Sequence, residues 1–271
     1  MKDKTILITG GSGYIGGYVW DKIFTHNLAN LDLKIGFDIR NKCDLDYIFK
    51  NNKIDLVIHL AGLIDVKEGE HKPLEYYHTN VEGTRLLLEA MKEYGVNKII
   101  FSSSASVYGN HEGMCNEDTP TNPISVYGKT KLISEELIKY SGLDYIIFRF
   151  FNVAGGNQQG DSLISKIKNN NKMTINGDDY DTKDGTCIRD FIHVEDIAEA
   201  IKLAIDIKTS ETINLGSNNG YSVLEVVKET NKLYEIGNRR DGDIVVSICN
   251  NKKAKEVLKW KPKKTLQEML M

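Results

Sequence analysis

A tyrosine and a lysine spaced four residues apart, Tyr127 and Lys131, could carry out acid–base chemistry together. The segment from Tyr127 to Tyr140 has a helical pattern, and residues four apart lie on one face of a helix, so both side chains can reach one ligand. A neighbouring ammonium group stabilises a phenolate and is expected to lower the pKa of the phenol from about 10 toward the working pH. The pair therefore indicates a general base.

Three consecutive serines, Ser102, Ser103 and Ser104, lie at the end of a predicted strand, Ile99 to Ser103. Ligands of open α/β sheets bind at the carboxyl ends of the parallel strands. A hydroxyl at that edge can relay a proton or hydrogen-bond a reacting oxygen. The serines therefore belong to the same predicted site as the tyrosine and the lysine.

The segment TGGSGYIG from Thr9 to Gly16 places Gly10, Gly13 and Gly16 between an apolar strand and a helix. In that setting the first two glycines allow a tight turn and the close approach of a pyrophosphate, and the third allows close helix packing. The amides of the helix N-terminus favour negative charge. The turn therefore predicts a dinucleotide site. The alternative is a tight βα turn that binds no nucleotide.

Asp38 ends a predicted second strand, Lys34 to Asp38, about twenty residues beyond the glycines, where a carboxylate can accept the hydroxyls of an adenosine ribose. This position favours NAD over NADP as the cofactor. Arg40 could instead meet a 2′-phosphate. A further alternative is that Asp38 and Asp44 are simply loop carboxylates.

These residues need a scaffold of alternating strands and helices. Further strands are predicted at Thr5 to Thr9, Leu56 to Leu60 and Tyr145 to Phe150, and helices at Tyr14 to His26 and Asn80 to Tyr94. Such alternation predicts an α/β fold with a doubly wound parallel sheet, the Rossmann type, covered by helices on both faces.

After Asn152 the pattern becomes irregular and rich in turns, which indicates a smaller C-terminal substrate domain. We expect residues 1–153, with about 188–214, to form the NAD-binding domain. Residues 154–187 and 215–271 are expected to form the domain that binds the substrate. A short strand from Thr212 to Leu215 and a helix from Val223 to Tyr234 complete the predicted elements.

The composition excludes several classes of protein. The 271 residues carry 35 basic and 38 acidic side chains, a formal charge of −3, which argues against nucleic-acid and anionic-membrane binding. No apolar run is long enough to cross a bilayer and no signal peptide is evident, so we expect a cytoplasmic protein. The four cysteines have no paired spacing, and we expect no metal site.

Six segments together resemble a known family. They are TGGSGYIG, HLAG at His59 to Gly62, SSSASVYG at Ser102 to Gly109, YGKTK at Tyr127 to Lys131, RFFN at Arg149 to Asn152 and DGTCIRDFIHVEDIA at Asp184 to Ala198. The chain is similar to the extended short-chain dehydrogenase/reductase family and, within it, to the UDP-glucose 4-epimerases. The resemblance runs from Thr5 to about Leu266, and this chain is a shortened member.

The resemblance implies a role for each matching residue. Tyr127 would be the catalytic base, Lys131 its partner and ribose clamp, and Ser104 the hydroxyl on the sugar oxygen. The residues expected to bind NAD are Gly10, Gly13, Tyr14, Ile15, Gly16, Asp38, Asp44, Leu45, Leu60, Ala61, Gly62, Asn80, Tyr127, Lys131 and Phe151. Those expected to bind the UDP-sugar are Ser104, Tyr127, Asn152, Arg189, Arg240, Asp243 and Ser247.

The reaction that the resemblance implies is inversion at C4 of a UDP-hexose through a transient 4-keto sugar. Ser247 stands where strict glucose/galactose enzymes carry a bulky tyrosine, so UDP-GlcNAc and UDP-GalNAc are possible substrates. A homodimer is expected by resemblance only, through the helices at 80–94 and 127–140.

Other readings of the chain remain open. One is a UDP-glucuronate 4-epimerase or decarboxylase, or another NAD-dependent enzyme that modifies nucleotide sugars. A 4,6-dehydratase needs an acid–base pair after the active-site hydroxyl, where this chain has Ala105 and Ser106. A non-catalytic NAD-binding sensor has no need of the phenol.

Overall fold

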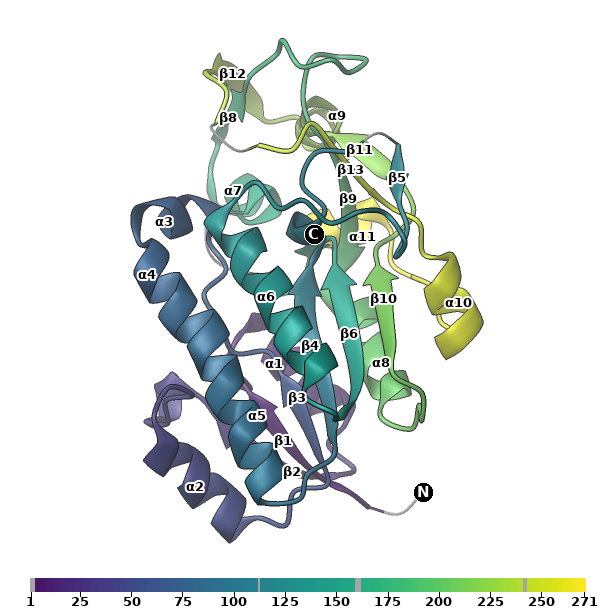
Figure 1. Ribbon diagram of the computed structural model, residues 1–271. Coiled ribbons are helices and arrows are strands. Elements are labelled where there is room, and N and C mark those ends of the chain that lie inside the picture. The colour runs from purple at the N-terminus through teal and green to yellow at the C-terminus, as the bar shows by residue number, and fades with distance from the viewer. Residues whose placement is uncertain (1–2, 112, 159–161, 241–242) are drawn as a thin grey trace.

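The computed structural model describes residues 3–111, 113–158, 162–240 and 243–271. Its centre is a six-stranded sheet in the order β10-β6-β4-β3-β1-β2, with all neighbouring strands parallel (Figure 1). The strands are β1 (Thr5–Thr9), β2 (Asn27–Leu31), β3 (Leu56–His59), β4 (Lys98–Ser104), β6 (Asp144–Phe150) and β10 (Glu211–Leu215). The predicted doubly wound parallel sheet is therefore confirmed.

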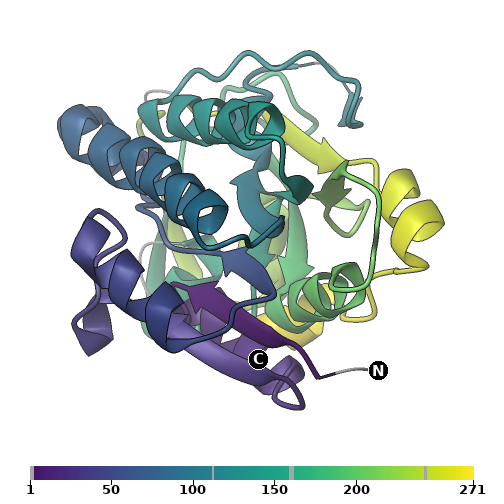
Figure 2. The same cartoon turned by 60° about the horizontal axis from the view of Figure 1, so that its bottom comes forward.

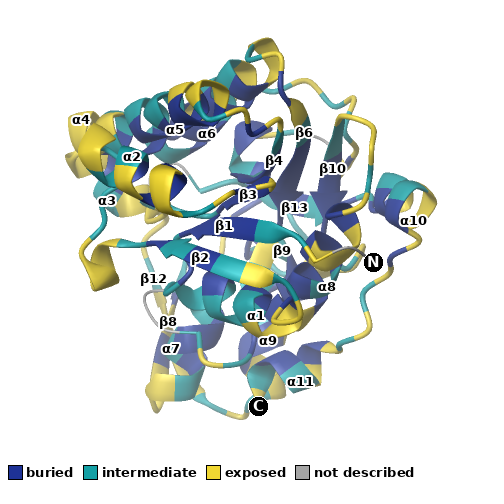
Figure 3. Cartoon of the chain, turned by 90° about the horizontal axis from the view of Figure 1, so that it is seen from below, coloured by how far each residue is buried: buried dark blue, intermediate teal, exposed yellow. Residues whose placement is uncertain are grey.

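Helices cover both faces of this sheet (Figure 2). One face packs on α1 (Tyr14–Lys22), α8 (Val194–Ala204) and α10 (Lys252–Leu258), and the other on α2 (Lys42–Asn51), α5 (Gly83–Glu93) and α6 (Val126–Tyr140). Two separate clusters of buried apolar side chains fill these layers. Figure 3 shows the outcome: the strands are mostly buried, and the exposed residues lie on the outer sides of the helices.

A smaller region lies beyond the carboxyl ends of the strands (Figure 1). Its sheet has the order β11-β9-β13-β5, and β7 also pairs with β9. These strands are β5 (Met114–Cys115), β7 (Asn152–Ala154), β9 (Ile188–His193), β11 (Gly220–Ser222) and β13 (Val246–Cys249), while β8 (Lys172–Asn176) pairs with β12 (Leu233–Gly237). The helices are α7 (Leu163–Asn169), α9 (Val223–Glu229) and α11 (Leu266–Leu270).

The remaining helical segments are short. Helix α3 (Val66–His71) ends at the non-helical Lys72, and α4 (Pro73–Tyr76) then continues through a π-helical segment, Tyr77–Glu82, into α5. Two 3₁₀ turns span Leu33–Ile35 and Ala105–Val107. None of the helices in the part of the chain that the structure describes has the length and apolar character needed to span a membrane.

The predicted second strand from Lys34 to Asp38 is wrong. The second strand is β2, Asn27–Leu31, and the residues after it form a 3₁₀ turn that ends at Gly36 with φ at +85°. Among the described residues no strand pairs with the outer edge of β2. Only one strand lies between α1 and β3, because the segment after β2 forms the 3₁₀ turn, a short irregular stretch and then α2.

The predicted division between the domains stays a prediction, but the sheets show where its elements lie. Of the residues 188–214, which we assigned to the NAD-binding domain, α8 and β10 pack in the large sheet layer. The strand β9 instead pairs with β7, β11 and β13 in the smaller region. The polypeptide thus crosses between the two regions at the junction of β9 and α8.

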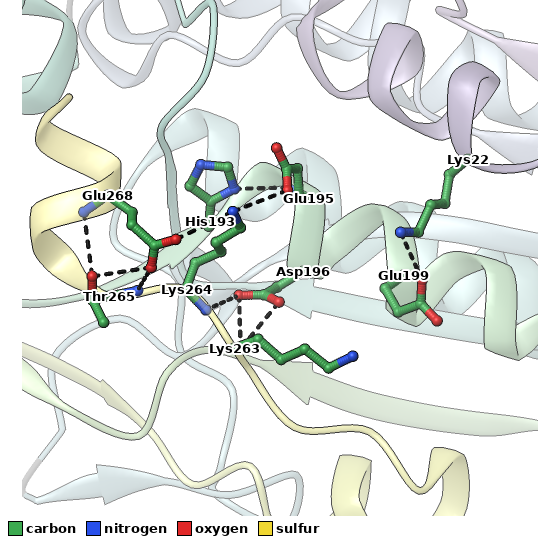
Figure 4. A network of polar contacts seen from close by, with 9 residues as sticks. All are labelled: Lys22, His193, Glu195, Asp196, Glu199, Lys263, Lys264, Thr265 and Glu268. Carbon is green, nitrogen blue, oxygen red and sulfur yellow. Dashed lines mark hydrogen bonds and ion pairs between the residues drawn. The ribbon is translucent and has the colours of Figure 1, made fainter.

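The C-terminal tail is held on α8 by a buried carboxylate, Asp196 (Figure 4). Its oxygens accept the backbone amides of Lys263 and Lys264 at 3.0–3.1 Å, and its own carbonyl accepts the indole N–H of Trp260 at 2.9 Å. One turn further along the helix, Glu199 makes an ion pair with Lys22 across 2.9 Å, and both of these side chains are partly exposed.

Replacing Asp196 by alanine should lower the free energy of unfolding by about 2 kcal/mol, because two amides lose their buried acceptor. The tail should then be cut faster by a protease under native conditions. Glu199→Ala is the matched control on the same helix and should cost less than about 1 kcal/mol, since exposed ion pairs contribute little. Equal losses for the two variants, measured by urea unfolding, would contradict this assignment.

Candidate active site

The glycine turn after β1 forms a cradle that only glycine allows. Gly10 has φ at +73°, and a Cβ there would lie 2.8 Å from the amide nitrogen of Ala61. A Cβ on Gly16 would lie 2.2 Å from the carbonyl oxygen of Gly10. Helix α1 begins at Tyr14, and its N-cap, Gly13, has no side chain that caps the first amides. The shape and the free helix terminus fit the pyrophosphate of NAD.

The end of β3 forms the neighbouring wall of the cradle. The amides of Leu60 and Ala61 bind the carbonyl and the hydroxyl of Thr9, at 3.0 and 3.2 Å. The buried His59 lies between two hydroxyls, those of Thr9 at 2.8 Å and Thr84 at 2.9 Å. Burial, together with the charge of Lys131, lowers the pKa of His59 to about 3, so the ring is neutral and structural.

The carboxylate beside the glycine turn is Asp32, which the sequence analysis did not single out. It follows β2, and its Oδ2 accepts the amide of Ser12 at 2.9 Å. Asp38 lies further along and accepts from both the backbone and the side chain of Arg40. The backbone N and Nε donate to Oδ1, both at 2.9 Å, and Nη2 donates to Oδ2 at 2.6 Å. The hydrogen bond from Arg40 holds the pKa of Asp38 below its ordinary value.

The argument for Asp38 from its place at a strand end therefore fails, and Asp32 holds that place. A ribose contact from Asp38 stays a prediction. The available signal was the spacing, because Asp32 stands 19 residues after Gly13 and Asp38 stands 25 after it. The apolar pattern pointed to the wrong strand, since two asparagines interrupt β2.

Asp44 and Leu45, predicted near the adenine, lie at the start of α2. Asp44 accepts the amide of Asp38 through its Oδ2 at 2.7 Å, so these two predicted residues are brought together. The side chain of Leu45 is completely buried in the core beneath α2. The residue as a whole has no exposed surface, and its contact with the cofactor stays a prediction.

The predicted catalytic residues do meet. Tyr127 and Lys131 lie on one face of α6, and the Tyr127 phenol shares a hydrogen bond with the Ser104 hydroxyl at the end of β4. Lys131 donates from Nζ to the carbonyl oxygen of Ser102 at 2.8 Å, and its Nζ lies 5.9 Å from the centre of the Tyr127 ring. A Cβ on Gly62 would lie 3.6 Å from this nitrogen, which places the lysine beside the wall formed after β3.

Two local features bring α6 this close to β4. Ser125 caps the helix by accepting the amide of Gly128 at 3.0 Å. A Cβ on Gly128 would lie 2.6 Å from the carbonyl oxygen of Ser106, so the glycine after the tyrosine is needed for the approach. The segment YGKTK thus encodes both the reactive pair and the close packing that positions it.

The predicted lowering of the tyrosine pKa is wrong for this structure. Burial raises the pKa of Tyr127 to about 12, and the hydrogen bond from Ser104 only partly offsets this. Burial also lowers the pKa of Lys131 to about 8, against the opposing charge of Glu135. The ammonium group is directed to a backbone carbonyl rather than to the phenol, so its charge does not overcome the loss of hydration.

Asn80 and Phe151, both predicted near the cofactor, are buried. The Asn80 side chain accepts the amide of Leu63 at 2.8 Å and donates to the carbonyl of Leu63 and to the hydroxyl of Thr130, both at 3.0 Å. It therefore ties the loop after β3 to α6. Phe151 packs in a small apolar cluster with Tyr108 and other residues of the region around β5. Both side chains are therefore engaged in contacts within the protein, and their contact with NAD stays a prediction.

On the substrate side, the pairing of β9 with β13 gathers three of the predicted residues. Arg189 is the register partner of Ser247, and its Nη2 lies 3.5 Å from Oδ1 of Asp243. Ser247 is 5% exposed. Asn152 begins β7, which pairs with β9 on the other side, and is exposed.

The side chain of Arg240 lies against Asn176 at the end of β8, and its carbonyl accepts the amide of Asp243 at 3.4 Å. With the Asn176 amide oriented to accept, its oxygen lies 3.1 and 3.0 Å from Nε and Nη2 of Arg240. The two residues help to line a cavity of about 310 Å³, together with Lys166, Asn170, Lys172, Met173 and Thr174. The lining of this cavity is mostly polar and basic. Asn176 was not singled out in the sequence because a single asparagine carries no signal there.

Two adjacent glycines of α1 provide a test of the cradle. Gly16→Ala should weaken NAD binding at least about 10-fold, because its Cβ collides with the Gly10 carbonyl and opens the turn. Gly17→Ala is the control, since a Cβ there meets nothing within 4 Å, and it should leave NAD binding unchanged. Calorimetric titration of each variant with NAD measures the effect, and equal affinities would contradict the cradle.

Within the ranges that the structure describes, no group of three or more histidine, cysteine or acidic side chains is arranged to hold a metal ion. The candidate site is built instead from the glycine cradle, the Ser104–Tyr127–Lys131 group and the guanidinium groups of the smaller region. These features allow proton transfer beside a bound dinucleotide.

Comparison with known proteins agrees with these features. Residues 6–216 match the NAD dependent epimerase/dehydratase family. The UDP-glucose 4-epimerase of Lactobacillus helveticus is 38% identical over 303 residues, an alignment that covers 95% of this chain and 92% of that protein. Because the alignment is longer than the 271-residue chain, it contains gaps in this chain, as expected of a shortened member.

Two solved structures are similar over 98% of this chain and 96% of their own chains. One is a UDP-glucose-4-epimerase from Stenotrophomonas maltophila with bound NAD and formylated UDP-arabinopyranose, with a TM-score of 0.91 and 33% identity. The other is the UDP-glucose 4-epimerase of Bifidobacterium longum in complex with NAD+ and UDP, with a TM-score of 0.90 and 33% identity. On the family match and these likenesses, the chain belongs to the NAD dependent epimerase/dehydratase family.

Proposed function

We propose that this enzyme inverts C4 of a UDP-hexose and interconverts UDP-glucose and UDP-galactose with NAD as its cofactor. The observation that carries the proposal is the contact of Ser104 and Tyr127 at the end of β4, beside Lys131 and the glycine cradle. The relatives reported above are UDP-glucose 4-epimerases, and two of their structures hold NAD with UDP or a UDP-sugar.

Each residue of the site has a part in this reaction. NAD, held by the glycine cradle, would supply the acceptor for the hydride of C4 and the donor that returns it to the opposite face of the 4-keto sugar. Tyr127 takes the proton of the 4-hydroxyl and gives it back, and Ser104 hydrogen-bonds the reacting oxygen. Because burial raises the pKa of Tyr127 to about 12, the positive charges of Lys131 and the nicotinamide are needed to stabilise the phenolate.

The substrate must be held firmly at one end and loosely at the other. Arg189 and Arg240 carry guanidinium groups that match the geometry of phosphate oxygens. They lie in the smaller region, apart from the catalytic group of the large sheet. Anchoring the UDP moiety there leaves the 4-keto sugar free to turn about its diphosphate linkage before the hydride returns.

Tyr127→Phe should reduce kcat at least about 100-fold while NAD binding stays within about 2-fold of the original value, because the ring remains and only the proton acceptor is lost. Tyr140→Phe is the control on the same helix, where the side chain is 90% exposed, and should retain full activity. Activity of Tyr127→Phe close to that of the original enzyme would remove the catalytic role. It would favour an enzyme that uses another base.

The identity of the sugar depends on the space beside β13. Ser247 is small and lies opposite Arg189 in the sheet, so we propose that 2-acetamido sugars are also accepted. Purified enzyme should interconvert UDP-GlcNAc and UDP-GalNAc, and Ser247→Tyr should slow this reaction at least about 10-fold more than that of UDP-galactose. If UDP-galactose reacts and UDP-GlcNAc does not at high enzyme concentration, the proposal is wrong.

We further propose that the enzyme is a cytoplasmic homodimer. Helices α5 and α6, which the resemblance places in the dimer interface, lie next to each other on one face of the sheet (Figure 1). The molar mass in solution from light scattering tests the dimer, and cell fractionation tests the location.

A further inference from the structure

A buried ion pair lies directly beneath the catalytic residues and takes no part in the reaction above. The carboxylate of Glu135 is 0% exposed and the side chain of Arg149 is 5% exposed. Arg149 Nε donates to Oε1 of Glu135 at 2.9 Å, and Nη2 donates to Oε2 at 2.7 Å. This bidentate ion pair joins α6 to β6. Lys139, one turn along α6, donates to the same carboxylate at 3.2 Å.

Glu135 also holds the serine run of β4. The hydroxyl of Ser103 donates to Oε1 of Glu135 at 2.5 Å. On either side of Ser103, the carbonyl of Ser102 accepts from Lys131, and the hydroxyl of Ser104 shares a hydrogen bond with Tyr127. Three consecutive residues of β4 thus contact three residues of α6.

The spacing on α6 makes these contacts a single row. Tyr127, Lys131 and Glu135 follow each other at intervals of four residues, so they lie along one face of the helix. A helix and a strand have different rises per residue, so α6 cannot slide or rotate against β4 and keep all three contacts. The row of contacts therefore fixes the position of α6 on β4. The contact of Glu135 is the innermost and the most deeply buried of the three.

Stability alone is a weak reason for a charged pair at this place. A buried ion pair gains little over well-packed apolar residues, because removing the two charges from water costs about as much as their attraction returns. Its directional hydrogen bonds, in contrast, specify one arrangement of the groups that it joins. A row of contacts that ends in two catalytic residues is a place where one arrangement matters.

The charges around this row also bear on Lys131. Burial would raise the pKa of Glu135, but the hydrogen bonds and charge of Arg149, with Ser103 and Lys139, hold it below its ordinary value. The ionised Glu135 in turn raises the pKa of Lys131, which burial lowers. The other titratable groups that face Lys131 are Tyr127 on α6 and the neutral His59 on β3. On the other side of the ion pair, the phenol of Tyr108 accepts from Arg149 at 3.0 Å.

We propose that Glu135, held by Arg149, is a positioning residue for the reaction. Through Ser103 it fixes the end of β4 against α6 and so sets the contact of Ser104 with Tyr127 and that of the Ser102 carbonyl with Lys131. Its charge keeps Lys131 protonated in the working pH range. The inference rests on the proposed epimerase reaction and extends it to a residue that touches neither substrate nor cofactor.

The first test is Ser103→Ala, which removes the link between Glu135 and β4 and leaves the ion pair intact. We expect kcat for UDP-galactose to fall about 10-fold or more, because small displacements of catalytic groups have large effects on rate. KM and NAD affinity should stay within about 2-fold, because neither ligand touches Ser103. Ser141→Ala, which removes a hydroxyl that binds the Ile138 carbonyl at the far end of α6, is the control and should keep its kcat.

The second test is Glu135→Gln, read from the dependence of kcat on pH. Removing the negative charge lowers the pKa of Lys131, so the fall of kcat at high pH should move to lower pH by about one unit. Ser103→Ala keeps the negative charge of Glu135, so the pH at which kcat falls should stay the same in that variant. Ser103→Ala carries the test by itself if the glutamine variant does not fold.

The possible results separate this inference from the reaction on which it rests. An unchanged kcat in Ser103→Ala, or a loss confined to stability and NAD binding, would overturn the positioning role while epimerisation by the unaltered enzyme still supports the proposed function. Absence of epimerisation by the unaltered enzyme would overturn both.

Discussion

The close packing of α6 against the end of β4 is the constraint on which the site depends. It brings a phenol, an ammonium group and a serine hydroxyl together at the carboxyl edge of a parallel sheet. The approach requires a glycine directly after the tyrosine, because a Cβ on Gly128 would collide with the Ser106 carbonyl. The same helix uses its next turns to bind the carbonyl of Ser102 and the hydroxyl of Ser103. Packing and chemistry are therefore encoded by the same few residues.

The electrostatics of this arrangement suit an enzyme that acts only when its cofactor is bound. The phenol of Tyr127 is half-buried, and the loss of hydration raises its pKa to about 12. The ammonium group of Lys131 is held by a backbone carbonyl and is backed by the charge of Glu135. In the proposed reaction a further positive charge beside the phenol would stabilise the phenolate, and NAD bound in the glycine cradle would supply that charge.

Much of the fold could be predicted from the sequence because buried parallel strands have a strong apolar pattern. Thr5–Thr9 was predicted with its observed bounds, and β3, β4, β6 and β10 within one residue at either end. The second strand could not be found in this way. Its sequence, NLANL, has polar residues at an edge of the sheet, while the apolar residues after it belong to a 3₁₀ turn. Because of this error the expected ribose ligand was placed at Asp38, whereas the carboxylate that follows the second strand is Asp32.

The parts of the candidate site that depend on helical spacing were predicted correctly. The properties that depend on how deeply a side chain is buried were not. Four residues of helix necessarily bring Tyr127 and Lys131 to one face, so that prediction needed no structure. The predicted direction of the Tyr127 pKa shift was wrong because burial, which the sequence does not show, raises this pKa more than the hydrogen bond from Ser104 lowers it. The Glu135–Arg149 pair was missed because charged residues are expected at the surface, and only the fold shows that this pair is buried.

The most direct test of the proposed reaction follows the hydrogen at C4. Purified enzyme is incubated in ordinary water with UDP-galactose that carries deuterium at C4, and the products are analysed by NMR. Return of the same hydride predicts UDP-glucose that keeps its deuterium at C4, with no net accumulation of NADH. Hydrogen from the solvent at C4, loss of water or carbon dioxide from the substrate, or no product at all would contradict the account.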